Sequence, residues 1–247
     1  QLAGIDLPLP EWARVGQSVE NVYLGLKSGL LDQFSSLYGK KDSFILCDFR
    51  SVEVLKTVTM PAGWKIVVAN TMVKHNLVES DYNQRRESCE RATKVIQGKF
   101  PQVKTLRDVS SSMLEECKSI LDHTDYLRAK HVVGEDERVM KGVELLEAGK
   151  VEEFGALWFQ SHESSRDCFE NSCPELDILV ELAHTIPGCV GARLSGGGFG
   201  GISIHLVRES EAENYCERLA AAYKLKTGKT IETIICSVGD GASAESL

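Results

Sequence analysis

The sequence has no apolar run long enough to cross a membrane. Its longest apolar stretches, such as KIVVA at residues 65–69 and ISIHLV at 202–207, fall far short of the roughly 20 residues that a membrane-spanning helix needs. A secretory signal pattern is also missing. We therefore expect a cytoplasmic protein that does not act at a membrane.

Positive charge is in deficit. Lysine and arginine number 28 against 36 aspartate and glutamate residues, which gives a formal net charge of −8 at pH 7. A nucleic-acid-binding surface needs clustered positive charge, because contacts with the phosphate backbone supply most of the affinity. The charge balance therefore argues against nucleic acids and anionic membranes as partners.

Patterns typical of disulfide frameworks and metal sites are missing as well. The eight cysteines are scattered, with no C-x-x-C pair and no cysteine–histidine cluster. His131, His162 and His184 fall in helical stretches without partners at i+3 or i+4 that would complete a metal site. The sequence therefore predicts free thiols in a reducing compartment, structural roles for the histidines and no metal site within this chain.

What the sequence does contain is enough apolar material, 43% of 247 residues, for one large or two small domains. The clearest break is Pro61-Ala62-Gly63. We place the domain boundary there and predict a first domain at 1–62 and a second at 63–247.

Apolar periodicity predicts two helices and two strands in the first domain. One helix begins at Pro10 with Trp12, Val15, Val19 and Val22 at helical spacing, and another follows Gly29; the strands cover 43–49 and 52–58. In the second domain, strands at 64–71, 189–195, 201–207 and 230–238 enclose a helical region and a helix near 210–227. This order predicts an α+β fold with a ferredoxin-like βαββαβ sheet, helices on one face, and extra helices. Capping boxes are predicted at Ser112/Glu115 and Ser172/Glu175.

The stretch GARLSGGGFGG at 191–201 satisfies G-x-G-x-x-G at Gly196, Gly198 and Gly201. A dinucleotide fingerprint needs a helix after the loop, because the helix N-terminus binds the pyrophosphate. A strand follows here, so the stretch is not interpreted as a dinucleotide-binding fingerprint. A tight hairpin explains about two of the glycines. We favour a loop stripped of side chains so that a ligand or another loop can approach its backbone.

Three further stretches have a structural and a functional interpretation. Asp32, in the first turn of a helix, is either a simple helix-start residue or a positioned carboxylate of the kind that orients a hydroxyl nucleophile. Tyr82 either covers a strand or contacts a ligand, and Arg85 and Arg86 are expected to pair with Glu87 or Glu90 on the surface. The serines at 110–112 are better explained as a helix cap than as a phosphate site.

Five segments, in order along the chain, resemble the galactokinase branch of the GHMP small-molecule kinases. They are residues 17–51, 68–90, 128–139, 154–180 and 191–207, the last containing the glycine loop. The resemblance implies a GHMP-kinase-like fold and transfer of the ATP γ-phosphoryl group, with Mg²⁺, to the C1 hydroxyl of galactose.

By the same resemblance, Asp32 is the catalytic aspartate near that hydroxyl, as a base or as an orienting group. Gly29 contacts the sugar through its backbone, and Tyr82 packs against the sugar or hydrogen-bonds it. Lys74, which the resemblance does not assign, is a weaker candidate for a cation near the transferred phosphoryl group; the alternative is a solvated surface lysine. The residues expected beside the phosphate-binding loop are Gly196, Gly197, Gly198, Phe199, Gly200 and Gly201.

Two segments of that family do not occur in these 247 residues: the sugar-binding R-x-N-x-x-G-E-H-x-D-Y and the phosphate-binding G-L-S-S-S-A. We therefore expect residues 1–62 to be a remnant of the family's N-terminal domain. We also expect this chain alone to be inactive and not to bind ATP or Mg²⁺ tightly. Exposed sheet edges and apolar surface near residues 1–60 predict self-association.

Two alternatives remain open. A galactokinase-like sensor or regulator would keep the fold without catalysis. A kinase for a related sugar, such as N-acetylgalactosamine, arabinose or a uronic acid, would keep the chemistry and change the substrate.

Overall fold

The chain divides into two compact units. The computed structural model describes residues 4–25, 28–73 and 78–243. The first unit comprises Gln1–Pro61 together with Ser237–Leu247, and the second comprises Ala62–Cys236. The second unit thus begins one residue before the boundary expected from the sequence, and the tail that the sequence placed with it belongs to the first unit.

The first unit combines helices with a small sheet. Helix α1 (Leu9–Ser18) continues into a π-helical turn (Val19–Tyr23), and α2 covers Leu31–Tyr38. Strands β1 (Ser43–Asp48) and β2 (Glu53–Thr59) pair antiparallel. Four buried residues form the core of this unit: Ala13, Leu30, Phe34 and Val52.

The tail joins this unit through hydrogen bonds to the segment between α2 and β1. The Lys41 amide donates to the Asp240 carboxylate at 3.0 Å, and the Asp42 amide donates to the Val238 carbonyl at 3.1 Å. The Gly241 amide donates to the Gly39 carbonyl at 2.8 Å. These bonds are the physical reason that the tail leaves the second unit after β6.

The apolar stripe on the first helix does not enter this core. The exposed fraction rises from 38% at Trp12 to 84% at Val22, with Val15 and Val19 between them. Ala13, on another side of α1, is the residue that packs against Phe34 and its neighbours. The periodicity therefore predicted the helix correctly, but its apolar face is left open.

The second unit is built on a four-stranded antiparallel sheet. Its strands are β3 (Trp64–Asn70), β4 (Cys189–Leu194), β5 (Ile202–Arg208) and β6 (Glu232–Cys236), in the order β4-β5-β3-β6. Numbered within this unit, that order is 2-3-1-4, with every neighbouring pair antiparallel. It is the order that a βαββαβ arrangement requires.

Helices α7 (Pro174–Thr185) and α8 (Ala212–Thr227) supply the main core over this sheet. Val67 and Ala69 alternate along β3 and pack with Ala192 and Val207 of the neighbouring strands. These strand residues pack against six residues of the two helices: Leu179, Val180, Ala183, Tyr215, Leu219 and Tyr223. Burial of these side chains is what holds the helices to the sheet.

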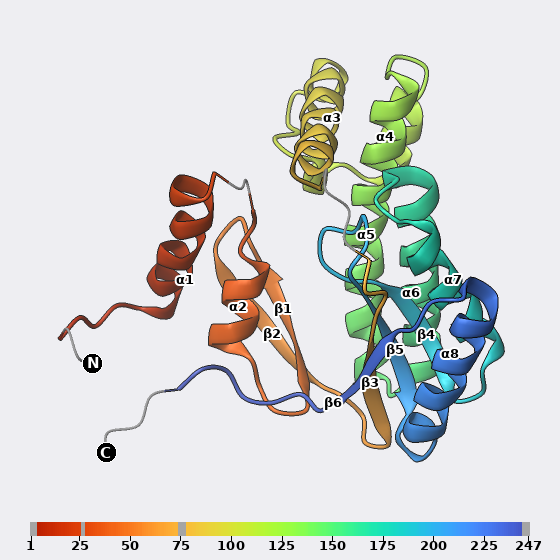
Figure 1. Ribbon diagram of the computed structural model, residues 1–247. Coiled ribbons are helices and arrows are strands. Elements are labelled where there is room, and N and C mark those ends of the chain that lie inside the picture. The colour runs from red at the N-terminus through yellow and green to blue at the C-terminus, as the bar shows by residue number, and fades with distance from the viewer. Residues whose placement is uncertain (1–3, 26–27, 74–77, 244–247) are drawn as a thin grey trace. The chain divides into compact units, whose positions relative to one another are not determined.

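A helical layer is inserted between β3 and β4 (Figure 1). It contains α3 (Val78–Lys99), α4 (Ser111–Cys117), α5 (His123–Glu147) and α6 (Val151–Ser164). A second apolar core joins α3, α4 and α5 through Ala92, Ile96, Leu114, Tyr126 and Ala129.

Among the described residues no helix is long and apolar enough to span a membrane.

The predicted capping boxes are wrong by one or two residues. Helix α4 is capped by Ser110, whose hydroxyl accepts the Met113 amide at 3.3 Å, so Ser112 lies inside the helix. At α7 the N-cap is Cys173, and the Ser172 hydroxyl instead donates to Asp177 at 2.6 Å. A capping box does form between Thr105 and Asp108, at a 3₁₀ turn.

Two histidines of the second unit are buried in the neutral state. His205 is fully buried between the hydroxyls of Ser203 and Tyr215, and burial lowers its pKa to about 3. Burial also lowers the pKa of His131 to about 4. The unfolded chain therefore binds more protons than the folded chain between these values and about pH 6.5.

This difference makes the fold sensitive to acid. Above pH 6.5 the neutral histidines do not reduce the free energy of unfolding. As the pH falls from 6.5 toward 4, that free energy decreases by about 1.4 kcal/mol per pH unit for each histidine. Urea unfolding between pH 7.5 and 5 measures it. His205→Gln is expected to reduce this slope, whereas the exposed His123→Gln is not; equal slopes in both variants would contradict the assignment.

Candidate active site

Asp32 and Gly29 lie at the start of α2 in the first unit. Asp32 is in the first turn and exposed, where the unpaired amides of the helix N-terminus favour a carboxylate. Gly29 is also exposed, and a Cβ built on it would meet no atom of the described residues within 4 Å, its chain neighbours apart. The local fold therefore does not require glycine at 29, and its backbone is open to a ligand.

The glycine loop connects β4 to β5 in the second unit. The Ser195 amide donates to the Ile202 carbonyl at 3.0 Å and closes the loop. The Gly201 carbonyl accepts both the amide and the hydroxyl of Thr71, at 2.9 and 2.8 Å, which ties the loop to the end of β3. The loop is thus anchored at its base on two strands.

Within the loop, Gly198 is required by a close contact with the segment before α7. A Cβ on Gly198 would lie 2.0 Å from the Asn171 carbonyl oxygen, and Gly198 has φ +83°. The Asn171 carbonyl also accepts the Phe199 amide at 2.6 Å, and its side-chain amide donates to the Gly197 carbonyl at 3.2 Å. The segment before α7 therefore approaches the backbone of the loop closely at Gly198.

Tyr82 lies beside the loop as well. A Cβ on Gly197 would lie 3.8 Å from Cδ2 of the Tyr82 ring. Gly196 and Gly197 are exposed, and among the described residues no acceptor takes their amide protons. Exposed amides of this kind can bind an anion. The structure thus brings Tyr82 and the glycine loop together. Asp32 and Gly29 belong to the other unit. Lys74 lies outside the described residues.

Arg85, one turn after Tyr82 on α3, does not pair with Glu87 or Glu90 as expected. Its Nε donates to the Phe169 carbonyl at 2.6 Å and its Nη2 to the Glu170 carbonyl at 2.8 Å. Arg128 of α5 donates to the Cys168 carbonyl and pairs with the Glu170 carboxylate. Two arginines therefore fix the turn that carries Asn171. Arg86, in contrast, pairs with Glu90 as expected, at 3.1 Å.

The end of β4 is held by a second polar group. The Leu194 amide donates to His162 Nδ1 at 3.2 Å, so the ring's Nε2 carries the proton and donates to Asp177 at 3.0 Å. Close by, Arg193 and Arg138 approach the Glu135 carboxylate at 3.5 and 2.6 Å. Burial would raise the pKa of Glu135, but the two arginines, together with the Ser161 hydrogen bond and His131, outweigh it and lower that pKa. The strand leading into the loop is therefore rigidly positioned.

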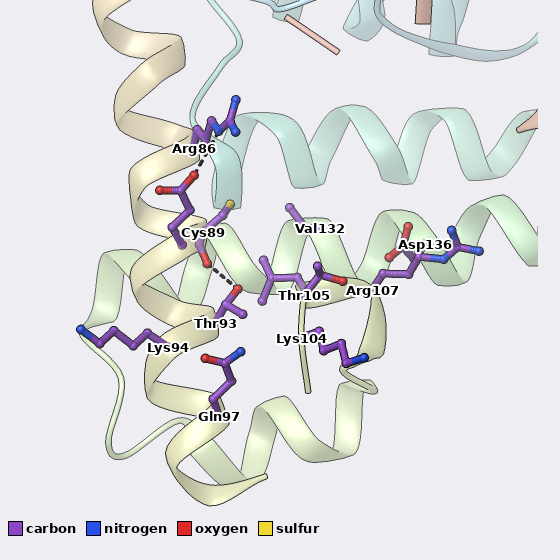
Figure 2. A pocket seen from close by; sticks show the side chains of 12 residues that line it. Arg86, Cys89, Thr93, Lys94, Gln97, Lys104, Thr105, Arg107, Val132 and Asp136 are labelled. Atoms are coloured by element: carbon purple, nitrogen blue, oxygen red, sulfur yellow. Dashed lines mark hydrogen bonds and ion pairs between the residues drawn. The ribbon is translucent and has the colours of Figure 1, made fainter. Parts of the chain in front are cut away.

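A cavity of about 730 Å³ lies elsewhere in this unit, between α3, the segment Lys104–Arg107 and α5. None of the predicted site residues lines it. Figure 2 shows the ammonium groups of Lys94 and Lys104 pointing in opposite directions, so its cations do not converge on one point. Within the described ranges no group of histidine, cysteine, aspartate and glutamate side chains could hold a metal ion.

Comparison with known proteins shows which proteins this chain is similar to. The model described as "GHMP kinases C terminal" matches residues 143–225, from the end of α5 into α8. The chain is 37% identical to the galactokinase of Roseiflexus sp. (strain RS-1), covering 94% of this chain and 59% of that protein. It is 40% identical to the galactokinase of Glaesserella parasuis serovar 5 (strain SH0165), covering 97% of this chain and 62% of that protein.

A solved structure agrees. The galactokinase of Lactococcus lactis, crystallised in complex with galactose, matches with a TM-score of 0.93 and 30% identity, covering 98% of this chain and 63% of that chain. The chain is similar to GHMP kinases. It spans about three fifths of the length of these galactokinases, to which it is similar along nearly all of its own length.

Three residues that shape the glycine loop were not among the candidates from the sequence. Asn171 and Arg128 had no role assigned, and Arg85 had the wrong partner. Each acts through a contact with a residue at least 26 positions away. The only available signal was that five glycines in six positions exceed what a hairpin needs.

Proposed function

We propose that the protein containing this chain is an ATP-dependent galactokinase, which phosphorylates the C1 hydroxyl of galactose. The observation that carries the proposal is similarity to galactokinases over 94–97% of this chain at 37–40% identity. The galactose complex of the Lactococcus lactis relative supports the choice of sugar. In this proposal the first unit is part of an N-terminal domain, and the second is a ferredoxin-like C-terminal domain.

Asp32 is proposed to act on the hydroxyl that is phosphorylated. Its exposure and its place in the first turn of α2 keep a carboxylate accessible and stabilised by the helix. Gly29 is exposed, and no described side chain other than its neighbours' lies within 4 Å of where its Cβ would be. Tyr82 offers an aromatic edge for the sugar.

The glycine loop is proposed to lie beside the transferred phosphoryl group. The exposed Gly196 and Gly197 amides support this role, because backbone amides stabilise phosphate oxygens without a side chain. ATP and Mg²⁺ are the proposed co-substrate and metal of the reaction. The eight free thiols support a reducing, cytoplasmic setting.

The test compares two proteins: the 247-residue chain and the full product of the gene that encodes it. Each is assayed for ATP consumption dependent on galactose, and for binding of galactose and of ATP separately by calorimetry. We expect phosphorylation by the gene product and none by the chain alone, because transfer needs a phosphate cradle and a metal. Binding of galactose without ATP turnover by the gene product would favour the sensor, and turnover only with N-acetylgalactosamine would change the substrate.

Self-association of the chain remains part of the proposal. The exposed apolar side chains along α1 and the following turn support it, from Leu9 and Trp12 to Val22. A clean monomer by light scattering at micromolar concentration would contradict it.

A further inference from the structure

We propose that Arg85 is a positioning residue that holds the glycine loop in the conformation needed for phosphoryl transfer. The catalytic part of this proposal, the effect on phosphoryl transfer, rests on the function proposed above. Arg85 is not expected to touch the sugar or the phosphates; it acts through the turn at 169–171 and through Phe199.

The first support is the geometry of the Arg85 fork. Nε and Nη2 reach two successive carbonyls, those of Phe169 and Glu170, at 2.6 and 2.8 Å. Two parallel bonds from one guanidinium fix both the position and the rotation of the turn. Glu170 has φ +52°, a conformation that costs a non-glycine residue energy and persists only when its surroundings hold it.

The second support is that the same guanidinium lies over the loop. The Arg85 Cζ is 5.5 Å from the centroid of the Phe199 ring, a cation–π distance. Phe199 has φ +59°, and its amide donates to the Asn171 carbonyl at 2.6 Å. Arg85 therefore contacts the loop directly at Phe199 and indirectly through the turn, so two strained residues share one anchor.

The third support is the neighbouring helix position. Tyr82 precedes Arg85 by three residues on α3, so both side chains lie on one face of that helix. Tyr82 lies beside Gly197 and Arg85 beside Phe199. One turn of α3 thus lies against the loop at Gly197 and at Phe199, so a shift of α3 would disturb the loop at both positions.

The chain offers a matched control at the next position. Arg86 is on the same helix with the same charge, but it is exposed and pairs with Glu90 on the surface. Arg85→Met and Arg86→Met therefore remove the same charge from the same helix, and only the first removes the anchor. Arg85→Lys keeps the charge over Phe199 but cannot donate the two parallel bonds of the fork.

The kinetic test uses the full gene product. Arg85→Met is expected to lower kcat for galactose phosphorylation about 10²-fold, because a displacement of the loop by about 1 Å lowers the rate by about that factor. The KM for galactose is expected to stay within about twofold of the wild-type value. Arg85→Lys is expected to recover part of kcat, and Arg86→Met to leave it unchanged. A purely structural Arg85 would lower the folded fraction while kcat per folded molecule stayed as in wild type, and that result would overturn the proposal.

The second test needs no catalysis and uses the 247-residue chain. Hydrogen exchange of the Phe199 amide, measured by NMR, reports the bond to Asn171. Exchange is expected to be at least about tenfold faster in Arg85→Met and unchanged in Arg86→Met. Unchanged exchange in Arg85→Met would overturn the proposal. Faster exchange combined with no galactose phosphorylation by the wild-type gene product would contradict the proposed function and leave the anchor established.

Discussion

Asp32→Asn is expected to lower galactose phosphorylation by the full gene product about 10²- to 10⁴-fold, the range that a positioned acid–base group contributes. Asparagine keeps the size of the side chain but cannot accept the proton of the sugar hydroxyl or stabilise it by charge. Stability should change little, because Asp32 is exposed and makes no cap hydrogen bond at the start of α2. The measurement is kcat at saturating ATP and galactose, with thermal unfolding as the check on folding.

Glu11 gives the matched control. It is an exposed carboxylate in the first turn of α1, so Glu11→Gln makes the same change of charge in the same local setting and in the same unit. It should leave kcat unchanged. Activity of Asp32→Asn within about threefold of wild type would remove Asp32 from the proton-transfer or orienting role. A common loss in both variants would indicate a general effect of charge near helix starts.

Features set by neighbours in sequence could be predicted. The six strands follow from short apolar or alternating runs between turn residues, and Pro61-Ala62-Gly63 falls at the observed division of the chain. The cap of α4 was misplaced because three successive serines, Ser110 to Ser112, all satisfy the local rule. Only the backbone geometry selects Ser110, whose extended φ and ψ fit an N-cap.

Features set by distant partners could not be predicted. The bond from Lys41 to Asp240 that draws the tail into the first unit spans 199 positions, and no local pattern carries it. Arg85 has glutamates nearby in sequence, yet it donates to carbonyls 84 and 85 positions away. Backbone carbonyls have no sequence signature, so an arginine that recognises them looks like any surface arginine.

Gly191→Ala is expected to lower the free energy of unfolding by about 3 kcal/mol or more, at or above the upper end of overpacking costs. A Cβ on Gly191 would lie 2.2 Å from the Gly155 carbonyl oxygen and 2.6 Å from its Cα. From the other side, a Cβ on Gly155 would lie 2.5 Å from the Val190 carbonyl oxygen. Because every clashing atom named here is backbone, no rotamer change relieves it, and α6 must move away from β4.

The geometry also predicts how the two substitutions combine. Gly155→Ala should cost about as much as Gly191→Ala, and the double variant should cost less than the sum, because one separation of α6 from β4 relieves both clashes. Gly98→Ala is the control. Gly98 sits in α3, and a Cβ there would meet no described atom within 4 Å apart from its own helix backbone and chain neighbours, so the substitution should stabilise the chain by about 0.5–1 kcal/mol. Urea unfolding of the 247-residue chain measures all four variants. A loss under about 1 kcal/mol in Gly191→Ala would mean that β4 and α6 are not packed backbone to backbone, and the rigid base inferred for the glycine loop would then lack its support.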